Sequence, residues 1–452
     1  MLDRSKRPDP DENISFEIPE IENFELKNGL KIFLVKKNSL PIVQFNFMVN
    51  SGSKNDLHVK KGLAYLTALL IDEGAGDLSA LELDNEIESL GSVLKVSCDH
   101  DSLSITLLCL KENLQKSFNI FSDVILKPKF EEEDFNRERK KLLNKIIQSN
   151  NEPSYIADTV FEKLVFRNSE YQHPVMGSKE SVENISNIDV KSFHNSNFYS
   201  NNCSLVIVGN ITKNEILSIT ENNLSNLINK ENAEDKFEID NSLNGNIYLV
   251  HKEGAAQSEI RVGHITNNRV HKDYFAKLIM NTILGGQFSS RLNSNLREDK
   301  GFTYGISSGF YYNKLSGQFE ISTAVQSENT YSALIEIYKE INAIKENILE
   351  EEIDFAKSYL IKRFPSQFET YSQVSRQLVT LVHYKLPYDY FNTYIKNIEE
   401  TTKEQIQNAA LNYINTNDLK TLVVGDREIV VEELKKIGKE IIELNTAGEI
   451  IN

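Results

Sequence analysis

The sequence predicts an α+β protein built from two homologous αβ halves, each a mixed or antiparallel sheet with helices on one face. The chain has 452 residues, which is more than a single hydrophobic core usually fills. The same order of strand and helix patterns occurs twice along it. Each half also contains hairpin-like strand pairs, which argue against a doubly wound parallel sheet.

Both halves open with two predicted strands followed by a helix. In the first half the strands are expected over residues 29–36 and 41–49, and the helix over residues 62–71. In the second half the strands are expected over residues 246–251 and 258–265, and the helix over residues 274–284. The shared order indicates duplication of one unit.

Each half continues with a strand pair, an acidic helix start and a closing strand. The strand pairs are predicted over residues 94–110 and 303–325, and the closing strands end in glycine at residues 205–210 and 422–426. The helix starts, near Phe130 and Ile348, place carboxylates on a first turn, where the helix dipole favours them.

These elements divide the chain into four parts. Residues 1–24 form an N-terminal extension, and residues 25–221 form the first domain. Residues 222–245, which are polar and lack apolar periodicity, are interpreted as a linker to the second domain at residues 246–445.

Composition excludes several classes of protein. The net charge of -16 argues against nucleic acid as a partner, and no apolar stretch is long enough for a membrane-spanning helix. Cys98, Cys109 and Cys203 form no CxxC pair and are expected to be buried. The polar N-terminus lacks the apolar core of a secretory signal, so we expect a cytoplasmic protein, or a periplasmic one if a leader was removed.

Three local patterns are interpreted as structural. GISSG at residues 305–309 matches a nucleophile elbow, but a strand pattern follows it, so Ser307 is expected within a strand. Gly285 and Gly286 are expected to end a helix through a positive-φ cap. The histidines do not recur at the helical spacing of a zinc site, although a site assembled from scattered histidines is left open.

Several longer segments together resemble the pitrilysin or insulinase family of metallopeptidases, in the class that includes processing peptidases. The resemblance covers residues 26–441 and is specific in order and spacing. Its segments are LKNGLKIFLVKKNSLPIVQFNFMVNSGS, GLAYLTALLIDEG, FNRERKKLLNKI, YQHPVMGSKESV, NCSLVIVGN and LNSNLREDKGFTYGISSGF. The resemblance implies two αβ halves facing each other like a clamshell around a peptide cavity.

In active relatives the segment that begins with GLA continues as H-x-x-E-H, with two zinc-binding histidines and a glutamate that activates water. A distal glutamate completes the ligand set. The resemblance places Tyr65 and Leu69 at the histidine positions, Ala68 at the glutamate and Lys145 at the distal ligand. These side chains predict no metal and no cofactor in this chain.

The second half keeps a pair of residues that relatives use at the active site. Arg297 and Tyr304 stand seven residues apart, as the family pattern requires. The resemblance implies that the guanidinium grips a peptide carbonyl or carboxylate and that the phenol donates to the developing oxyanion. The alternative is a solvated charge at Arg297 and an ordinary strand aromatic at Tyr304.

The resulting hypothesis is a pseudopeptidase: a non-catalytic, peptide-binding subunit of a heterodimeric zinc metalloendopeptidase complex. A homologous H-x-x-E-H partner would hold the zinc, and an extended peptide would add a strand to a sheet edge, with residues 94–107 as the candidate edge. The overall charge suggests an acidic cavity wall and basic peptides. Alternatives are a catalytically inert scaffold or core-type subunit without a role in proteolysis, and an independent hydrolase that uses Ser307.

Overall fold

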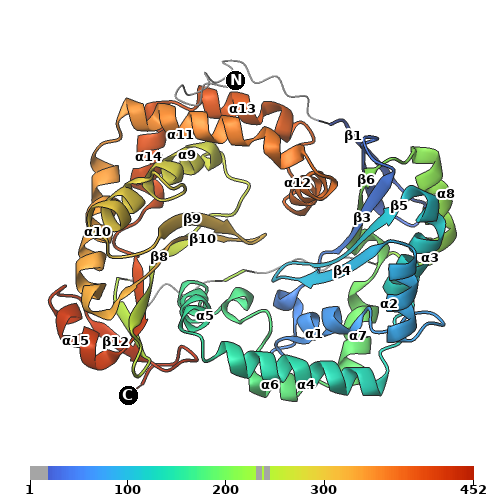
Figure 1. The fold of residues 1–452 in the computed structure, drawn as a ribbon, viewed down its shortest axis with the longest axis horizontal. Coiled ribbons are helices and arrows are strands. Elements are labelled where there is room, and N and C mark those ends of the chain that lie inside the picture. Colours follow the sequence, from blue (N-terminus) through green and yellow to red (C-terminus); the bar gives the residue numbers. More distant parts are fainter. Residues whose placement is uncertain (1–18, 231–236, 239–244, 452) are drawn as a thin grey trace, which may run out of the picture.

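The computed structural model describes residues 19–230, 237–238 and 245–451, and it consists of two halves that face each other (Figure 1). Each half contains one six-stranded sheet with helices on its outer side. The two halves with mixed sheets agree with the fold class that the sequence predicts. Residues 1–18 of the expected extension, and residues 231–236 and 239–244 of the expected linker, lie outside the described residues.

The first sheet has the strand order β1-β2-β6-β3-β5-β4. β2 and β6 run parallel, and the other neighbouring strands are antiparallel. The last residues of the expected N-terminal extension, from Ile21 on, belong to β1. The strands are β1 (Ile21–Glu25), β2 (Lys31–Lys36), β3 (Ile42–Val49), β4 (Val93–Cys98), β5 (Leu103–Leu110) and β6 (Cys203–Gly209).

The second sheet has the order β12-β7-β11-β8-β10-β9, which repeats five positions of the first sheet. The sixth position differs: β12 comes from the end of the chain and pairs in parallel with β7, whereas β1 pairs antiparallel with β2. The strands are β7 (Ile247–His251), β8 (Gln257–Thr266), β9 (Ile306–Tyr312), β10 (Gly317–Gln326), β11 (Lys420–Gly425) and β12 (Ile441–Leu444).

Eight helices belong to the first half and seven to the second half of the described chain. The first-half helices are α1 (Leu63–Leu70), α2 (Ala80–Ser89), α3 (Leu114–Leu126), α4 (Glu132–Ser149), α5 (Pro153–Val165), α6 (Lys179–Glu183), α7 (Asn187–Asn197) and α8 (Lys213–Leu224). The second-half helices are α9 (Tyr274–Leu284), α10 (Thr330–Glu346), α11 (Glu350–Arg363), α12 (Tyr371–His383), α13 (Tyr390–Glu400), α14 (Lys403–Tyr413) and α15 (Arg427–Lys435). Within the described ranges, none of these helices has the length and apolar character needed to cross a bilayer.

The two halves exchange one helix each. α5 of the first half packs on β8 and β11 of the second sheet, and α12 of the second half packs on β3 and β6 of the first sheet (Figure 1). The central strands β6 and β11 are therefore covered on both faces and are buried along their whole length. Their continuous apolar sequences fit this environment. The prediction of helices on one face only was thus incomplete.

Local predictions had mixed outcomes. Ser307 lies in β9, as expected. Gly285 and Gly286 end α9, but neither has a positive φ. A Cβ at Gly285 would lie 2.5 Å from Ser308 Oγ, so glycine is required there for a close approach rather than for a left-handed turn. Cys98, expected to be buried, is only partly so.

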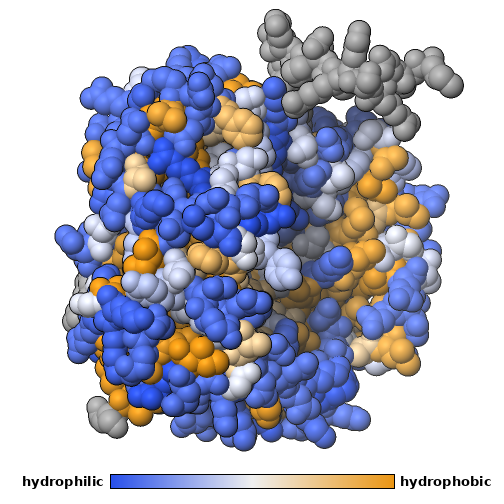
Figure 2. Space-filling view, turned by 60° about the vertical axis from the view of Figure 1, so that its left-hand side comes forward, coloured by the Kyte–Doolittle hydropathy of each residue, from blue (hydrophilic) through white to orange (hydrophobic). Residues whose placement is uncertain are grey.

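The surface between the halves is hollowed, and hydrophilic side chains cover most of the face beside it (Figure 2). Apolar side chains gather in a few separate patches on the same face. This hollow is where the two sheets and the exchanged helices approach each other.

Candidate functional site

The helix α1 begins at a position that only glycine fits. Gly62 has a φ of 94°, and a Cβ there would lie 2.5 Å from the Met176 carbonyl oxygen. The buried Asp56 carboxylate accepts hydrogen bonds from the backbone N–H of Gly62 at 2.7 Å and of Ala64 at 2.8 Å. Burial raises the pKa of Asp56 to about 7, against the opposing effect of these hydrogen bonds. The GLA frame is therefore needed to fold the helix, whatever stands at the catalytic positions.

The four degenerate zinc-site positions lie on two neighbouring helices. Tyr65, Ala68 and Leu69 are on α1, and Lys145 is on α4, which packs against α1. Lys145 Nζ donates a hydrogen bond to Tyr65 Oη at 2.9 Å and lies 5.4 Å from the centre of the tyrosine ring. Ala68 is only 5% exposed, and Leu69 packs against the first-half core. Tyr65 and Lys145, which lie eighty residues apart in the sequence, are therefore in contact in the structure.

These residues do not fit a zinc ion. Zinc in proteins takes thiolate, imidazole or carboxylate ligands. Leu69 has no lone pair, and the Lys145 ammonium places a positive charge where a cation would be held. In the described part of the chain, no three histidine, cysteine, aspartate or glutamate side chains gather where they could hold a metal. No step of a reaction is assigned to a metal in this chain.

Carboxylates beside this region are engaged by cations. Glu138 on α4 is buried and accepts hydrogen bonds from Arg137 Nε at 3.1 Å and from Lys141 Nζ at 2.7 Å. Arg137 also pairs with Glu73. Burial raises the pKa of Glu73 to about 7, and the charge of Glu138 adds to the increase. The sequence alone did not single out this cluster, because its charges resemble a solvated helix face.

Arg297 lies on a π-helix, Asn293–Asp299, at the surface of the second half. Its guanidinium carbon lies 4.1 Å from the centre of the Phe288 ring, and its Nη1 lies 3.3 Å from Glu298 Oε1. Phe288 is itself 65% exposed. A guanidinium stacked on an exposed ring is held in position while its donor groups still reach solvent. Phe288 was missed by the sequence analysis, which treated its segment as a helix end.

Tyr304 lies just before β9 and is 94% exposed. The neighbouring Thr303 fixes the loop, because its hydroxyl donates to the Ala324 carbonyl oxygen at 2.8 Å. The Tyr304 side chain therefore projects from an anchored backbone. Arg297 and Tyr304 both lie at the surface, seven residues apart in the same segment of the chain. Among the hydrogen bonds of the described residues, none joins the two side chains.

Each sheet has one edge strand beside these features. β4 is the edge of the first sheet and packs against α1. Of the candidate edge at residues 94–107, the first part lies in β4, whereas residues 103–107 belong to β5, an interior strand between β3 and β4. β9 is the corresponding edge of the second sheet and follows directly after Tyr304. The second edge was not predicted from the sequence. Edge strands leave backbone groups that an extended peptide can pair with.

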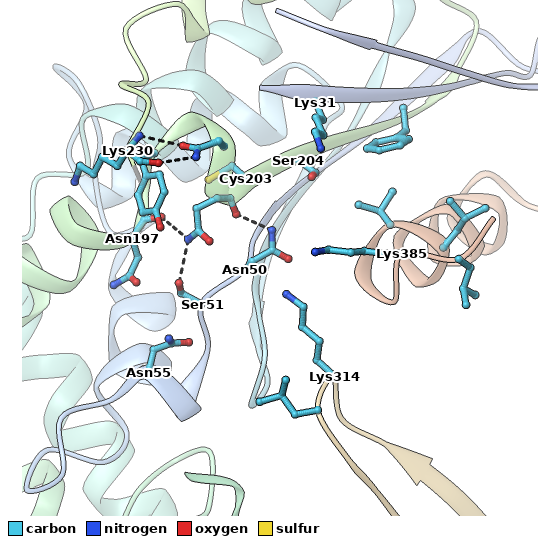
Figure 3. Close-up of a pocket in the computed structure, with 18 of the residues that line it drawn as sticks. Lys31, Asn50, Ser51, Asn55, Asn197, Cys203, Ser204, Lys230, Lys314 and Lys385 are labelled. Atoms are coloured by element: carbon cyan, nitrogen blue, oxygen red, sulfur yellow. Dashed lines mark hydrogen bonds between the residues drawn. The ribbon is translucent and has the colours of Figure 1, made fainter. Parts of the chain in front are cut away.

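A cavity of about 1070 Å³ lies between the two halves (Figure 3). Its walls come from β2, β6, the end of α7 and the segment after β3 in the first half, and from α12 and the β9–β10 turn of the second half. Among the described residues that line it, there is no aspartate or glutamate. For this described part of the wall the expectation of an acidic lining is wrong, because net charge does not determine where the charges lie. The described wall contains four lysines: Lys31, Lys230, Lys314 and Lys385.

The β9–β10 turn is fixed to the first half by a buried carboxylate. Asp101, in the β4–β5 turn, accepts hydrogen bonds from Tyr171 Oη and from the backbone N–H of Lys314, both at 2.7 Å. Its Oδ1 lies 3.2 Å from Lys54 Nζ, and its Oδ2 lies 3.9 Å from His383 Nε2. Burial alone would raise the pKa of Asp101, but the Lys54 charge and these hydrogen bonds hold it below its ordinary value.

Comparison with known proteins identifies the family. Residues 31–179 match the family described as insulinase (peptidase family M16), and residues 184–360 match the peptidase M16 inactive domain. The chain belongs to peptidase family M16. At the first-half motif it is an inactive member, because Tyr65, Ala68, Leu69 and Lys145 replace the residues that bind zinc and activate water.

Three relatives illustrate the range of the family. An uncharacterized zinc protease of Rickettsia felis is 24% identical over 350 residues, covering 75% of this chain and 82% of that protein. The non-peptidase homolog YmxG of Helicobacter pylori is 24% identical over 383 residues, covering 83% and 87%. A crystal structure of a peptidase M16 inactive domain from Pseudomonas fluorescens superposes with a TM-score of 0.84 at 23% identity, covering 90% of this chain and 98% of that one. The names of these relatives differ on catalysis, so the role of this chain must be argued from its own residues.

Proposed function

We propose that this protein is the non-catalytic, peptide-binding subunit of a two-chain zinc metallopeptidase. The zinc and its H-x-x-E-H motif belong to a homologous partner, and this chain supplies Arg297 and Tyr304 to the partner's active site. The proposal rests most on one observation: Tyr304 is 94% exposed at the end of an anchored loop, with no role in this chain's own core.

Arg297 supports the same role. Its guanidinium is oriented by Phe288 and keeps part of its surface accessible. An exposed aromatic ring beside a preoriented arginine, with the exposed Tyr304 seven residues further along the chain, is typical of a surface that another chain covers. A guanidinium can bind a peptide carboxylate or carbonyl, and a phenol can stabilise an oxyanion in the partner's site.

The two edge strands suggest how a peptide is held. A peptide paired with β4 would pass the α1 helix, whereas one paired with β9 would begin beside Tyr304. Backbone pairing accepts many sequences, so it suits a subunit that presents extended peptides to a separate catalytic centre.

The test mixes this chain with a family member that has an intact H-x-x-E-H motif from the same organism and measures cleavage of a fluorogenic peptide. We expect no turnover by this chain alone and turnover by the mixture. Tyr304→Phe removes one oxyanion donor and is expected to lower kcat by roughly a hundredfold. Arg297→Ala is expected to lower kcat/KM, while the urea unfolding midpoints of both variants stay near that of the wild type.

A matched control is Arg363→Ala on α11. Arg363 also lies over an aromatic ring, with its guanidinium carbon 5.8 Å from the centre of the partly buried Tyr359, but it is not part of the proposed site. Its replacement should leave turnover unchanged. Wild-type turnover in both the Arg297 and Tyr304 variants would reject the proposal and favour the inert scaffold. Turnover by this chain alone that depends on Ser307 would favour the independent hydrolase.

A further inference from the structure

We propose that the cavity between the two halves binds the carboxylate groups of acidic peptides. The inference depends on the function proposed above only in taking the ligand to be a peptide, and it reverses the preference for basic peptides that composition suggested.

The charge of the cavity wall is opposite to that of the chain. Acidic residues outnumber basic ones 66 to 50 in the sequence, but the described residues of the cavity wall include four lysines and no acidic residue. Lys230 is used within the fold, because its Nζ donates to the Asn195 carbonyl oxygen at 2.8 Å. Lys31 and Lys385 form no ion pair with any described residue. Lys31 and Lys385 therefore present positive charge to the cavity that no described residue neutralises through an ion pair.

Three of these lysines reach the cavity from separate rigid elements. Lys31 is the first residue of β2, and Lys385 lies two residues after the end of α12, which packs on the first sheet. Lys314 lies in the turn that Asp101 binds through its backbone. Figure 3 shows Lys314 and Lys385 extending from the second half toward Asn50 of the first half. Like charges placed around one cavity repel one another, and a bound anion relieves that repulsion.

The backbone at Lys385 supports a ligand-binding role for its side chain. Lys385 has a φ of 52°, in the left-handed region, and it occupies the position after the helix where glycine is most favourable. The backbone N–H of Leu386 donates to the Leu381 carbonyl oxygen at 2.9 Å and closes this helix end. The chain thus has a lysine at a position where its backbone is less stable than that of glycine. A strained residue beside a cavity is a recognised sign of function.

The rest of the wall suits a peptide rather than a small inorganic anion. The cavity is at the upper end of the size range of ligand pockets, which is far larger than a phosphate requires. Asparagine and serine side chains line it beside the lysines, and the Asn50 amide is held by a hydrogen bond to the Asn202 carbonyl oxygen at 2.8 Å. Amides and hydroxyls can pair with a peptide backbone, while the lysines bind its carboxylates.

The experiment measures binding of fluorescent peptides to the isolated full chain by anisotropy. The peptides share one length and differ in charge: a glutamate-rich peptide, its glutamine analogue and a lysine-rich peptide. We expect the acidic peptide to bind most tightly, and its affinity to fall as salt is raised. A C-terminally amidated acidic peptide distinguishes the two sources of carboxylate: lost binding assigns the site to the α-carboxylate, and retained binding assigns it to side chains.

Variants connect binding to the cavity. Lys31→Gln and Lys385→Gly are each expected to weaken acidic-peptide binding by about fivefold or more. Lys385→Gly should also retain or raise the thermal midpoint, so weaker binding cannot result from unfolding. The control is Lys396→Gln on α13, where an exposed lysine pairs with Glu400; its affinity should equal that of the wild type.

Equal binding of the glutamate and glutamine peptides, or wild-type affinity in both cavity variants, would overturn the inference. Displacement of the peptide by inorganic phosphate at equal concentration would overturn the assignment to a peptide. The assay needs no partner subunit, so its outcome is independent of the turnover test. Loss of acidic-peptide preference would leave the roles of Arg297 and Tyr304 untouched, and the converse also holds.

Discussion

Replacing Asp101 by asparagine tests how the two halves are held together around the cavity. Asp101 is 3% exposed and accepts hydrogen bonds through both carboxylate oxygens. Asparagine has nearly the same shape, but it offers one acceptor oxygen and one donor group. Its oxygen can face either Tyr171 and Lys54 or the backbone N–H of Lys314, so the donor group must face other donors on the opposite side.

The expected loss of unfolding free energy is about 3 kcal/mol. One part is the cost of a buried hydrogen-bond donor left without an acceptor, about 1–3 kcal/mol. The other part is the loss of a countercharge beside the buried Lys54. Removing one partner of a buried ion pair costs about 3–5 kcal/mol when the remaining charge keeps no other partner. The expected loss of unfolding free energy is smaller than the two costs added together, because Tyr171 can still donate to the asparagine oxygen.

The pH dependence of this effect has a defined sign. The pKa of Asp101 in the folded protein is below its ordinary value. Folding therefore favours the ionised carboxylate, and this contribution is present above the unfolded pKa, about 4. It is lost as the pH falls through the lowered folded pKa. The difference between wild type and Asp101→Asn should be largest at neutral pH and should shrink below about pH 4.

Urea unfolding at about pH 7, 5 and 3, followed by circular dichroism, measures these differences. The control is Glu400→Gln, an acid-to-amide change in an exposed ion pair with Lys396, which should cost less than about 1 kcal/mol. If Asp101→Asn costs no more than this control at pH 7, the buried carboxylate does not hold the halves together.

Two further changes follow from other contacts. Burial raises the pKa of Glu320, which lies beside Arg261, to about 7. Folding therefore favours the protonated carboxyl group, and the stability that Glu320 contributes falls as the pH rises from about 4.5 through 7. Glu320→Gln should raise the free energy of unfolding by about 2 kcal/mol at pH 8 and change it little at pH 4. Equal effects of the substitution in urea titrations at both pH values would contradict this prediction. Lys145→Met removes the exposed hydrogen bond to Tyr65 and should lower the free energy of unfolding by less than about 1 kcal/mol, and a larger loss would show that the pair is a structural centre of the first half.

Most strands of the fold were predictable from local patterns. Alternating or continuous apolar stretches marked five strands of each sheet, and the repeat of their order indicated two similar halves. The sixth strands were missed, because β1 lies in a polar N-terminal stretch and β12 is short. The exchange of α5 and α12 was also missed. An amphipathic pattern shows that a helix has an apolar face, but it does not show which sheet that face covers.

The candidate site was also predictable from the sequence only in part. Tyr65 and Lys145, which the family pattern selects by their spacing, are joined by a hydrogen bond. The cavity lysines were not predictable, since Lys31, Lys314 and Lys385 are far apart in sequence and meet only through the exchange of α12 and the position of the β9–β10 turn. Composition gave the total charge of the chain, but the placement of charge depends on tertiary structure.

The central claim is that α1 and α4 cannot hold a zinc ion, so hydrolysis must depend on another chain. The most direct measurement is the zinc content of the purified full chain, by mass spectrometry after incubation with zinc and dialysis against metal-free buffer. The account predicts almost no retained zinc, with no difference between wild type and Lys145→Met. About one zinc per chain that is lost when Tyr65 is replaced by phenylalanine would contradict it.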